Sequence, residues 1–298
     1  MAAAKENTVV STDLTAAREI DYVQRFTNEV GILKDILGVS RVEVHEAGTK
    51  ITAKKADVTL NDTPVGEGEE IPYNEVDYTD VEVGTLTWDK QAIGVSMEAI
   101  AKRGYAGAVQ SADDNMLYKQ RANIVKRFVD FIQTGTLTPT VADAATITTF
   151  QMGVAYAQGL VQQRWEDMNL GTAGVIGFVN TLDAFKYLGA AQITVQEAFG
   201  MQYIENFMGY SKLFLTSRMP ANKIVALPEQ NTVLYHIDAT DNDFSKAGFE
   251  FRTDGQDNLI AVHVEGNHKT MVSELTTVSG IGIYAEYLDG IAVVEVNP

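Results

Sequence analysis

The sequence lacks cysteine altogether and has no long hydrophobic run. Without cysteine, disulfides, thiolate zinc sites and a cysteine nucleophile are excluded. No apolar run approaches the roughly 18 residues that a membrane-spanning helix needs. The first residues, MAAAKENTVVSTD, contain no apolar stretch typical of a secretory signal. We therefore expect a soluble protein with no membrane partner that is made and used in a cytoplasm.

Basic residues are scarce: 23 Lys and Arg stand against 40 Asp and Glu, a formal net charge of −17. Direct binding of nucleic acid needs clustered Lys and Arg to displace counterions, so the charge argues against it. Solubility alone explains the excess of acid. A second interpretation, an acidic wall that does not adhere to DNA stored beside it, stays open because charge cannot decide between the two.

Motifs for catalysis and metal binding are missing. No two histidines have the i, i+4 spacing of a helical zinc site; they are His45, His236, His263 and His268. The segments starting at Gly94 and Gly209 give only the first half of a serine nucleophile elbow. No P-loop is present, and Gly280-Ile-Gly282 lacks the third glycine of a dinucleotide fingerprint. We predict that the protein is not an enzyme and has no catalytic, cofactor-binding or metal-binding residue.

What the sequence does contain is enough apolar material for a core, since 45% of its 298 residues are hydrophobic. The first strong pattern is an amphipathic helix that begins near Thr12 or Asp13 and closes at Gly38 and Ser40. Its apolar stripe has helical spacing and consists of Val23, Phe26, Val30, Leu33 and Leu37. Such a stripe usually packs on its own subunit, and a contact with a partner or scaffold is the alternative.

A strand-like region from Arg41 to Val95 follows, with turn residues in its middle. We place the tip of a two-stranded ribbon near Asp62 to Tyr73. Between Ala56 and Asp89 there are ten acids and no Lys or Arg. An isolated two-stranded ribbon is marginally stable at best in water. It must therefore lie on something else, and the simplest candidate is another copy of the chain.

The acids near the ribbon tip allow three interpretations. They could hold a hard cation, but they lack the ligand order of an EF-hand. A solvated edge that prevents wrong strand pairing is the favoured one. The third is complementarity to basic residues of a neighbouring subunit, among which we also considered Lys102 and Arg103. The candidate inter-subunit contacts are Glu67, Glu69, Glu70, Glu75, Asp77, Lys119, Arg121, Lys126 and Arg127.

A short helix from Ser96 to Ala108 precedes a long one that a capping box of Ser111 and Asp114 would start. The long helix has about 24 residues and spans roughly 35 Å. Its apolar side consists of Leu117, Ile124, Val125, Phe128, Phe131 and Ile132, and Gly135 stops it.

The second half begins after a Thr- and Ala-rich linker, TLTPTVADAATITT. We predict a helix from Phe150 to Trp165, a buried strand at GVIGFV and a helix capped by Asn180. Further strands are expected at LFLTS, KIVAL, TVLYHI, FEFR, LIAVHV, GIGIYAEYL and IAVVEV. Helices and strands are segregated more than alternated, so the fold class is α+β.

Several segments, in this order, resemble the major capsid protein of tailed bacteriophages, whose Hong Kong 97-like shell fold also occurs in encapsulins. The nearest likeness is to long-tailed phages of Gram-positive bacteria. The resemblance covers nearly the whole chain and is carried by FTNEVGILKDILGV with GTKI, VGEGEEIP, EAIAKRGYAGAV, RFVDFIQTG, GFVNTLDAFKYLG and LFLTSRMPANKIVAL.

The resemblance implies a layout of five parts: an N-terminal arm (1–40), an extended E-loop β-hairpin (41–95), a P-domain with a long spine helix (96–144), an A-domain (145–245), and C-terminal strands that complete the P-domain and A-domain (246–298). It also implies a structural role in a virion. Copies would form hexamers and pentamers of an icosahedral capsid, assembled through a procapsid in the host bacterial cytoplasm around double-stranded DNA that is not read by sequence.

Two family features are not expected here. The lysines of the ribbon lie towards its base, so we predict no covalent cross-linking through them; they are Lys50, Lys54, Lys55 and Lys90. The arm is too short for an internal scaffold segment, which favours a separate scaffolding protein beside a portal. An encapsulin-type nanocompartment shell is the alternative, and a soluble enzyme or carbohydrate-binding module is a remote one.

Overall fold

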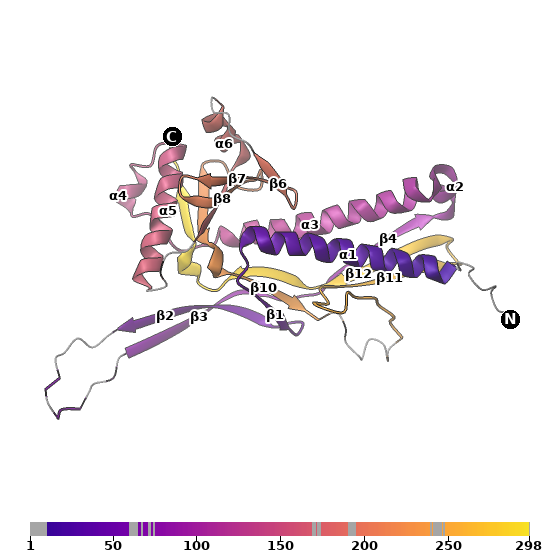
Figure 1. Ribbon diagram of the computed structural model, residues 1–298, viewed down its shortest axis with the longest axis horizontal. Coiled ribbons are helices and arrows are strands. Elements are labelled where there is room, and N and C mark those ends of the chain that lie inside the picture. The colour runs from indigo at the N-terminus through magenta and orange to yellow at the C-terminus, as the bar shows by residue number, and fades with distance from the viewer. Residues whose placement is uncertain are drawn as a thin grey trace.

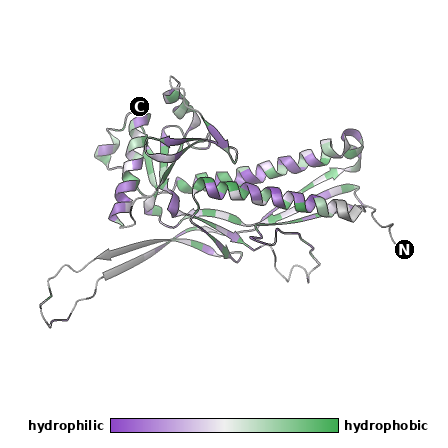
Figure 2. Ribbon diagram, viewed as in Figure 1, coloured by the Kyte–Doolittle hydropathy of each residue, from purple (hydrophilic) through white to green (hydrophobic). Residues whose placement is uncertain are grey.

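The computed structural model describes residues 11–59, 65–66, 68–70, 73, 75–168, 171, 174–189, 195–238, 240, 246 and 248–297. The molecule is elongated (Figure 1). Two long helices lie beside long strands in one half, a lobe of strands and short helices forms the other end, and a two-stranded ribbon projects from the body. Hydrophobic and hydrophilic bands alternate along the long helices, as amphipathic packing requires (Figure 2).

The predicted first helix is confirmed as α1, Ser11–Leu37. Every residue of its apolar stripe is at most 2% exposed, so the stripe packs on its own subunit. Gly38 ends the helix at φ +60°, where a Cβ would lie 2.7 Å from Cβ of Glu229. Lys212 Nζ donates to the carbonyls of Asp35 and Ile36, both at 3.1 Å, and caps the last turn.

The next helical region is a continuous series of helical segments rather than two separately capped helices. α2, Met97–Tyr105, contains a break at Gly104 (φ 73°, ψ 168°). A wider turn, η1, Ala106–Gln110, then runs directly into α3, Ser111–Ile132. The predicted capping box at Ser111 is therefore wrong, because the backbone at Gln110 and Ser111 is already helical. The predicted apolar side of α3 is confirmed, since all its members are buried.

A six-stranded sheet forms the lobe, with strand order β14-β9-β5-β8-β7-β6. The strands are β5 Val175–Val179, β6 Gln196–Ala198, β7 Met201–Phe207, β8 Tyr210–Leu215, β9 Lys223–Pro228 and β14 Ala292–Glu295. Ile176 and Phe178 join the core beneath α1 and α3, whereas Val175 and Val179 join the core with the lobe helices. The sheet therefore lies between two hydrophobic cores and contributes side chains to both.

The helices of the lobe follow the sequence prediction. α5 is Phe150–Asp167 and α6 is Thr181–Leu188. The Asn180 side chain caps α6 by accepting the Leu182 N–H at 2.8 Å. The linker before α5 is more structured than expected, because it contains α4, Val141–Ala144, and buries Ile147.

Two three-stranded sheets connect the lobe to the long helices, in the orders β1-β10-β13 and β11-β12-β4. Their strands are β1 Arg41–His45, β4 Asp89–Ser96, β10 Thr232–Ile237, β11 Ile260–Asn267, β12 Val272–Ser279 and β13 Ile281–Ala285, with single turns η2 Glu229–Asn231 and η3 Leu288–Gly290 between strands. The predicted strand FEFR is wrong, since only Arg252 forms a bridge, to Val262. Strands β6, β7 and β12 were not predicted.

Candidate subunit interface

The ribbon consists of β2, Lys50–Thr59, and β3, Glu75–Thr85, which form a sheet of their own. They pair antiparallel over their whole length, with a register shift between Ile51 and Thr52. Ten residues of strand reach roughly 33 Å. Figure 1 shows the far end of the ribbon projecting beyond the body, away from α3.

Among the ribbon residues whose burial is described, the buried ones lie at the foot. Ile51 is 4% exposed and Ala53 2%, and Ile51 packs with Leu86 against the side chains of β10. At Gly84 a Cβ would overlap the ring and hydroxyl of Tyr284. The body therefore holds the ribbon at one end, through close contacts that leave no room for a larger residue.

Beyond the foot, the described side chains at residues 79–82 of β3 are exposed. At the tip, Tyr73 is 94% exposed. An isolated two-stranded ribbon is marginal in water, and these described side chains are open to contact with a further surface.

The structure places the predicted acids along this ribbon. Glu69 and Glu70 are exposed at the tip, where Glu69 Oε2 accepts the Gly66 N–H at 3.0 Å. Glu75 and Asp77 lie in β3, and Glu67 lies outside the described residues. The ribbon end points away from α3 (Figure 1), so the acids at the tip can meet the basic residues of α3 only on another copy.

Two of the predicted basic residues already have partners in their own chain. Arg121 Nη1 lies 3.2 Å from Glu29 Oε1, and its guanidinium lies 5.3 Å from the ring centroid of Tyr118. Arg127 Nη2 lies 3.4 Å from Asp89 Oδ2. These pairs join residues far apart in the sequence, which a local pattern cannot reveal.

The other two predicted basic residues remain available. Lys119 and Lys126 are both exposed, and neither forms an ion pair with any part of the chain that the structure describes. They lie seven residues apart on α3, so they share one face of the helix about 10 Å apart. Of the four basic residues of α3 that were predicted as contacts, these two are available to pair with a neighbouring subunit.

A buried polar network that the sequence did not reveal joins α1 to α3. Arg18 binds Asp113 through Nη2 to Oδ1 at 2.6 Å and Nε to Oδ2 at 2.7 Å, with both side chains less than 10% exposed. Tyr22 Oη donates to Gln120 Oε1 at 2.8 Å, and Gln120 Nε2 donates to Thr277 Oγ1 at 2.7 Å. Burial, then the charge of Asp113, raises the pKa of Tyr22. The network attaches the arm to the body.

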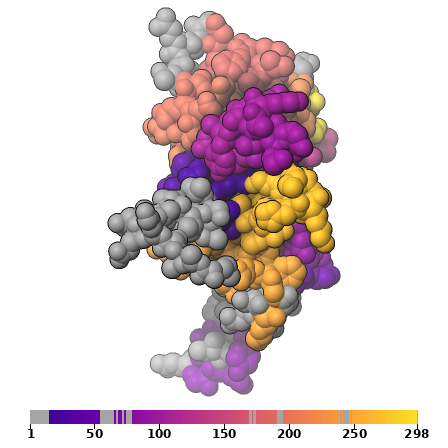
Figure 3. Space-filling view, turned by 90° about the vertical axis from the view of Figure 1, so that its right-hand side faces the viewer, coloured from indigo at the N-terminus to yellow at the C-terminus, as the bar shows by residue number. Residues whose placement is uncertain are grey.

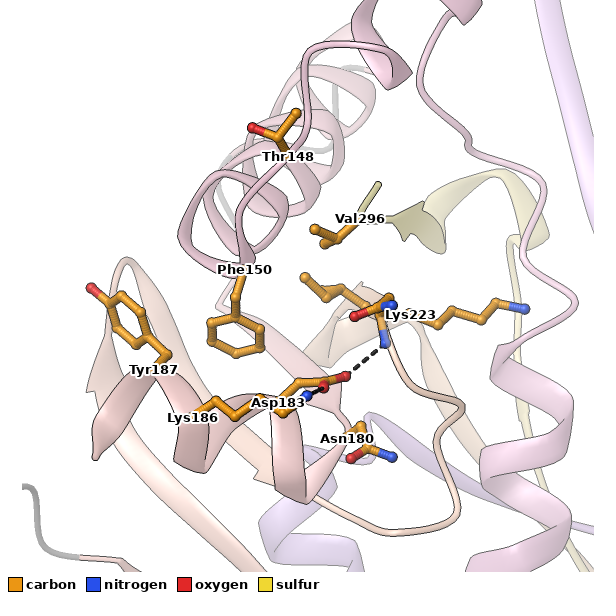
Figure 4. Close-up of a pocket in the computed structure, with 10 residues that line it drawn as sticks. Thr148, Phe150, Asn180, Asp183, Lys186, Tyr187, Lys223 and Val296 are labelled. Carbon is orange, nitrogen blue, oxygen red and sulfur yellow. Dashed lines mark hydrogen bonds and ion pairs between the residues drawn. The ribbon is translucent and has the colours of Figure 1, made fainter. Parts of the chain in front are cut away.

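The carboxylate in the cleft beside α6 has a structural role. The cleft of about 380 Å³ beside α6 is shown in Figure 4. Its carboxylate, Asp183, accepts the Asn222 N–H at 2.6 Å and lies 3.4 Å from Lys186 Nζ, so it fastens a loop to α6. Within the described residues there is no group of three His, Asp or Glu suited to a metal ion, and no described helix is long and apolar enough to cross a membrane.

An arm helix, a projecting ribbon, a long helix beside sheets and a terminal lobe together define the Hong Kong 97-like capsid fold, which solved structures match over most of the chain. The capsid asymmetric unit of cyanophage A-1(L) has a TM-score of 0.52 at 12% identity, covering 88% of this chain and 92% of that one. The capsid of a native GTA particle has a TM-score of 0.51 at 9% identity, covering 100% and 95%.

A third solved structure, the mature capsid of bacteriophage PhiM1, has a TM-score of 0.50 at 10% identity and covers 87% of this chain and 86% of that one. At such low identity the likeness establishes the fold. No family model and no curated protein sequence matches the chain.

Proposed function

We propose that this chain is the major capsid protein of a tailed bacteriophage, of the kind found in long-tailed phages of Gram-positive bacteria. Many copies form hexamers and pentamers that close into an icosahedral shell around double-stranded DNA. The observation that carries the proposal is the ribbon, which is anchored at its foot and exposed at residues 79–82 and at Tyr73 beyond it. A chain that cannot stabilise its own ribbon is suited to an assembly in which a neighbour does so.

The five-part layout is proposed with the boundaries given above: arm 1–40, E-loop 41–95, P-domain 96–144, A-domain 145–245 and C-terminal strands 246–298. Within the E-loop range, the free ribbon is the part formed by β2 and β3. The strands at either end of that range, β1 and β4, pair with β10 and β12 of the body. These two flanking strands supply the fixed base from which the ribbon extends.

The contact between ribbon and neighbour is proposed to be partly electrostatic. Glu69 and Glu70 carry charge at the exposed tip, and Lys119 and Lys126 are exposed on α3. Because Arg121 and Arg127 are held by Glu29 and Asp89, they contribute less than the two lysines. Exposed ion pairs add only about 0–1 kcal/mol each, so they set register while buried apolar area supplies most of the affinity.

The remaining partners follow from the same proposal. DNA is enclosed without sequence-specific binding, since the chain carries a net charge of −17. A separate scaffolding protein and a portal act during assembly. We propose that no covalent cross-link forms, because the ribbon lysines Lys50, Lys54 and Lys55 lie in β2, towards the base of the ribbon and before its tip.

The test is to express the full chain alone and together with a candidate scaffolding protein, followed by negative-stain electron microscopy and sedimentation. Closed shells, tubes or regular five- and six-fold rings support the proposal. A monomer in both preparations, over a range of concentration and salt, contradicts it. Shells that co-purify with a protein cargo instead of packaging DNA would favour the encapsulin alternative.

A further inference from the structure

The turn between β6 and β7 has a strained backbone. Ala198 pairs with Met201, so Phe199 and Gly200 form a two-residue turn, and both have positive φ, at 52° and 69°. Such turns suit the twist of a hairpin, but their first position favours Asn, Asp or Gly. A bulky residue such as phenylalanine is unfavourable in this left-handed conformation. The turn therefore depends on contacts outside itself that hold Phe199 in place.

The contacts that hold Phe199 come from the long helices. Its side chain is 5% exposed and, like that of Met201, lies in the core that the lobe sheet shares with α1 and α3. The guanidinium of Arg121, on α3, lies 5.6 Å from the Phe199 ring centroid, within the range of a cation–π contact. Figure 1 shows β6 on the side of the lobe that faces the long helices. Figure 3, viewed from the opposite end of the molecule, shows the lobe above them.

Arg121 is in turn held by the arm. Its Nη1 lies 3.2 Å from both carboxylate oxygens of Glu29, on α1, and its guanidinium lies 5.3 Å from the ring centroid of Tyr118. A Cβ at Gly200 would lie 3.0 Å from Arg121 Nη2, so the turn and the guanidinium are in close contact. One cation therefore connects α1, α3 and the edge of the lobe sheet.

The closed turn is balanced by opposing effects. Burial of the Phe199 ring and its contact with Arg121 favour it, whereas the strain in the backbone opposes it. The Arg121–Glu29 pair is open to water, with side chains 22% and 29% exposed, and such pairs are weak. β6 has three residues and pairs with β7 at the edge of the lobe sheet. The turn can therefore leave the long helices without breaking the rest of the sheet.

We propose that the turn of Phe199 and Gly200 is a releasable clasp, through which the arm helix controls the position of the lobe edge. In the closed state Glu29 holds Arg121, and Arg121 holds Phe199. A partner that draws Glu29 away from Arg121 opens the clasp, and β6 then moves off the long helices. Because coupling between two sites is reciprocal, a partner that displaces the turn also loosens the arm at Glu29. The clasp lies within one subunit, so it operates whether or not the chain forms a shell.

The first test is hydrogen exchange of the backbone amides at residues 198–201 in the purified full chain. E29Q removes the charge that holds Arg121, and we expect exchange at the turn to become about fivefold or more faster. R121M should have an effect at least as large. The control, D114N, makes the same change of charge in another ion pair between α1 and α3, that of Asp114 with Arg25, and should leave exchange at the turn unchanged.

The double variant E29Q/R121M distinguishes a clasp from two unrelated losses. If Glu29 acts through Arg121, the double variant exchanges at the turn no faster than R121M. Additive effects of the two changes overturn the proposal, and so does equal exchange in E29Q and D114N.

A second measurement follows the lobe edge itself. The chain has no cysteine, so Q24C/E197C places one spin label at an exposed position of α1 and one on β6. We expect the distance distribution from double electron–electron resonance to contain a longer component, about threefold or more populated when E29Q is added. Adding D114N should leave the distribution unchanged. A distribution that E29Q does not alter overturns the proposal, because faster exchange alone would then report only local fraying of the turn.

Discussion

The lobe sheet and the ribbon are both built of strands, yet they obtain their stability from different sources. All five residues of β5 are buried, between two cores supplied by the same chain. The ribbon strands are twice as long or more, at 10 and 11 residues, but among their side chains whose burial is described, the buried ones lie at the foot. Strand length and pairing alone therefore do not make an element stable; a covering layer does, and we propose that a neighbouring subunit supplies the covering layer of the ribbon.

The largest expected effect on the free energy of unfolding is a substitution in the lobe sheet, compared with one in the ribbon. Phe214 is fully buried and stacks on Phe178 with ring centroids 4.9 Å apart. F214A should lower the free energy of unfolding by about 3–5 kcal/mol. V81A, in the exposed part of β3, should change it by at most about 0.5 kcal/mol. Urea unfolding of the purified subunit measures both, and similar losses for the two variants would contradict the comparison.

The arm is held on the body by a buried ion pair, Arg18 with Asp113. R18M should destabilise the subunit by about 3–5 kcal/mol, because Asp113 is left charged and buried. R25M should cost about 0–1 kcal/mol, because Asp114, its partner at 2.5 Å, is half exposed. The double variant R18M/D113L should recover much of the loss. If it is as unstable as R18M, stranded charge is not the cause.

At the ribbon foot, close packing leaves no space for a side chain at Gly84. G84A should cost about 1–3 kcal/mol through overpacking, because Tyr284 is held in turn by Phe131, whose ring centroid is 5.1 Å away. The matched change at the tip is G66A, where the Cβ would meet only the flexible end of Glu69. It should be nearly neutral in thermal unfolding. A neutral G84A would mean that the foot is less closely held than the contacts indicate.

His236, in the middle strand of the sheet that bears the foot, is expected to make stability depend on pH. It is 2% exposed, and burial lowers its pKa. Below about pH 6.5 the unfolded imidazole binds a proton that the folded one resists, so stability falls as pH decreases, by up to about 1.4 kcal/mol per pH unit. H236N should remove this slope between pH 7.5 and 5.5, and H268N, at an exposed site, should leave it. An unchanged slope in H236N would exclude His236 as its source.

The smallest effect on the subunit is expected at the ribbon tip. E69K/E70K should leave the free energy of unfolding within about 0.5 kcal/mol of wild type and should reduce assembly into shells or rings. E166K/E250K makes the same change of charge at exposed positions elsewhere and should assemble normally. Normal assembly of E69K/E70K would remove the tip acids from the interface.

Much of the fold could be predicted because local patterns matched tertiary packing. The stripe of α1, the buried strand β5 and the Asn180 cap are of this kind. β12 was missed because Val272, Leu275 and Val278 recur every three residues, unlike a strand, while its buried face carries Thr277 and Ser279. Thr277 is tolerated there because Gln120 donates to its hydroxyl.

At FEFR and at the candidate contacts, the sequence pattern alone could not show which residues pair across distant segments. Phe249 and Phe251 stack on each other with centroids 6.1 Å apart, but within the described residues their segment is held to a strand only by the bridge from Arg252 to Val262. The predicted contact residues Arg121 and Arg127 are held by Glu29 and Asp89. Which charges remain free depends on pairs between distant segments, and the folded chain is needed to find them.

We propose that the ribbon is stabilised by a neighbouring subunit, whereas the lobe sheet is stabilised by its own chain. Hydrogen exchange of the backbone amides in the free subunit and in assembled shells tests it most directly. We predict that amides of β2 and β3 beyond Ala53 and Val81 exchange rapidly in the free subunit and are protected in shells, while those of β5 and β9 are protected in both. Equal protection of the outer ribbon in the two states would contradict the account.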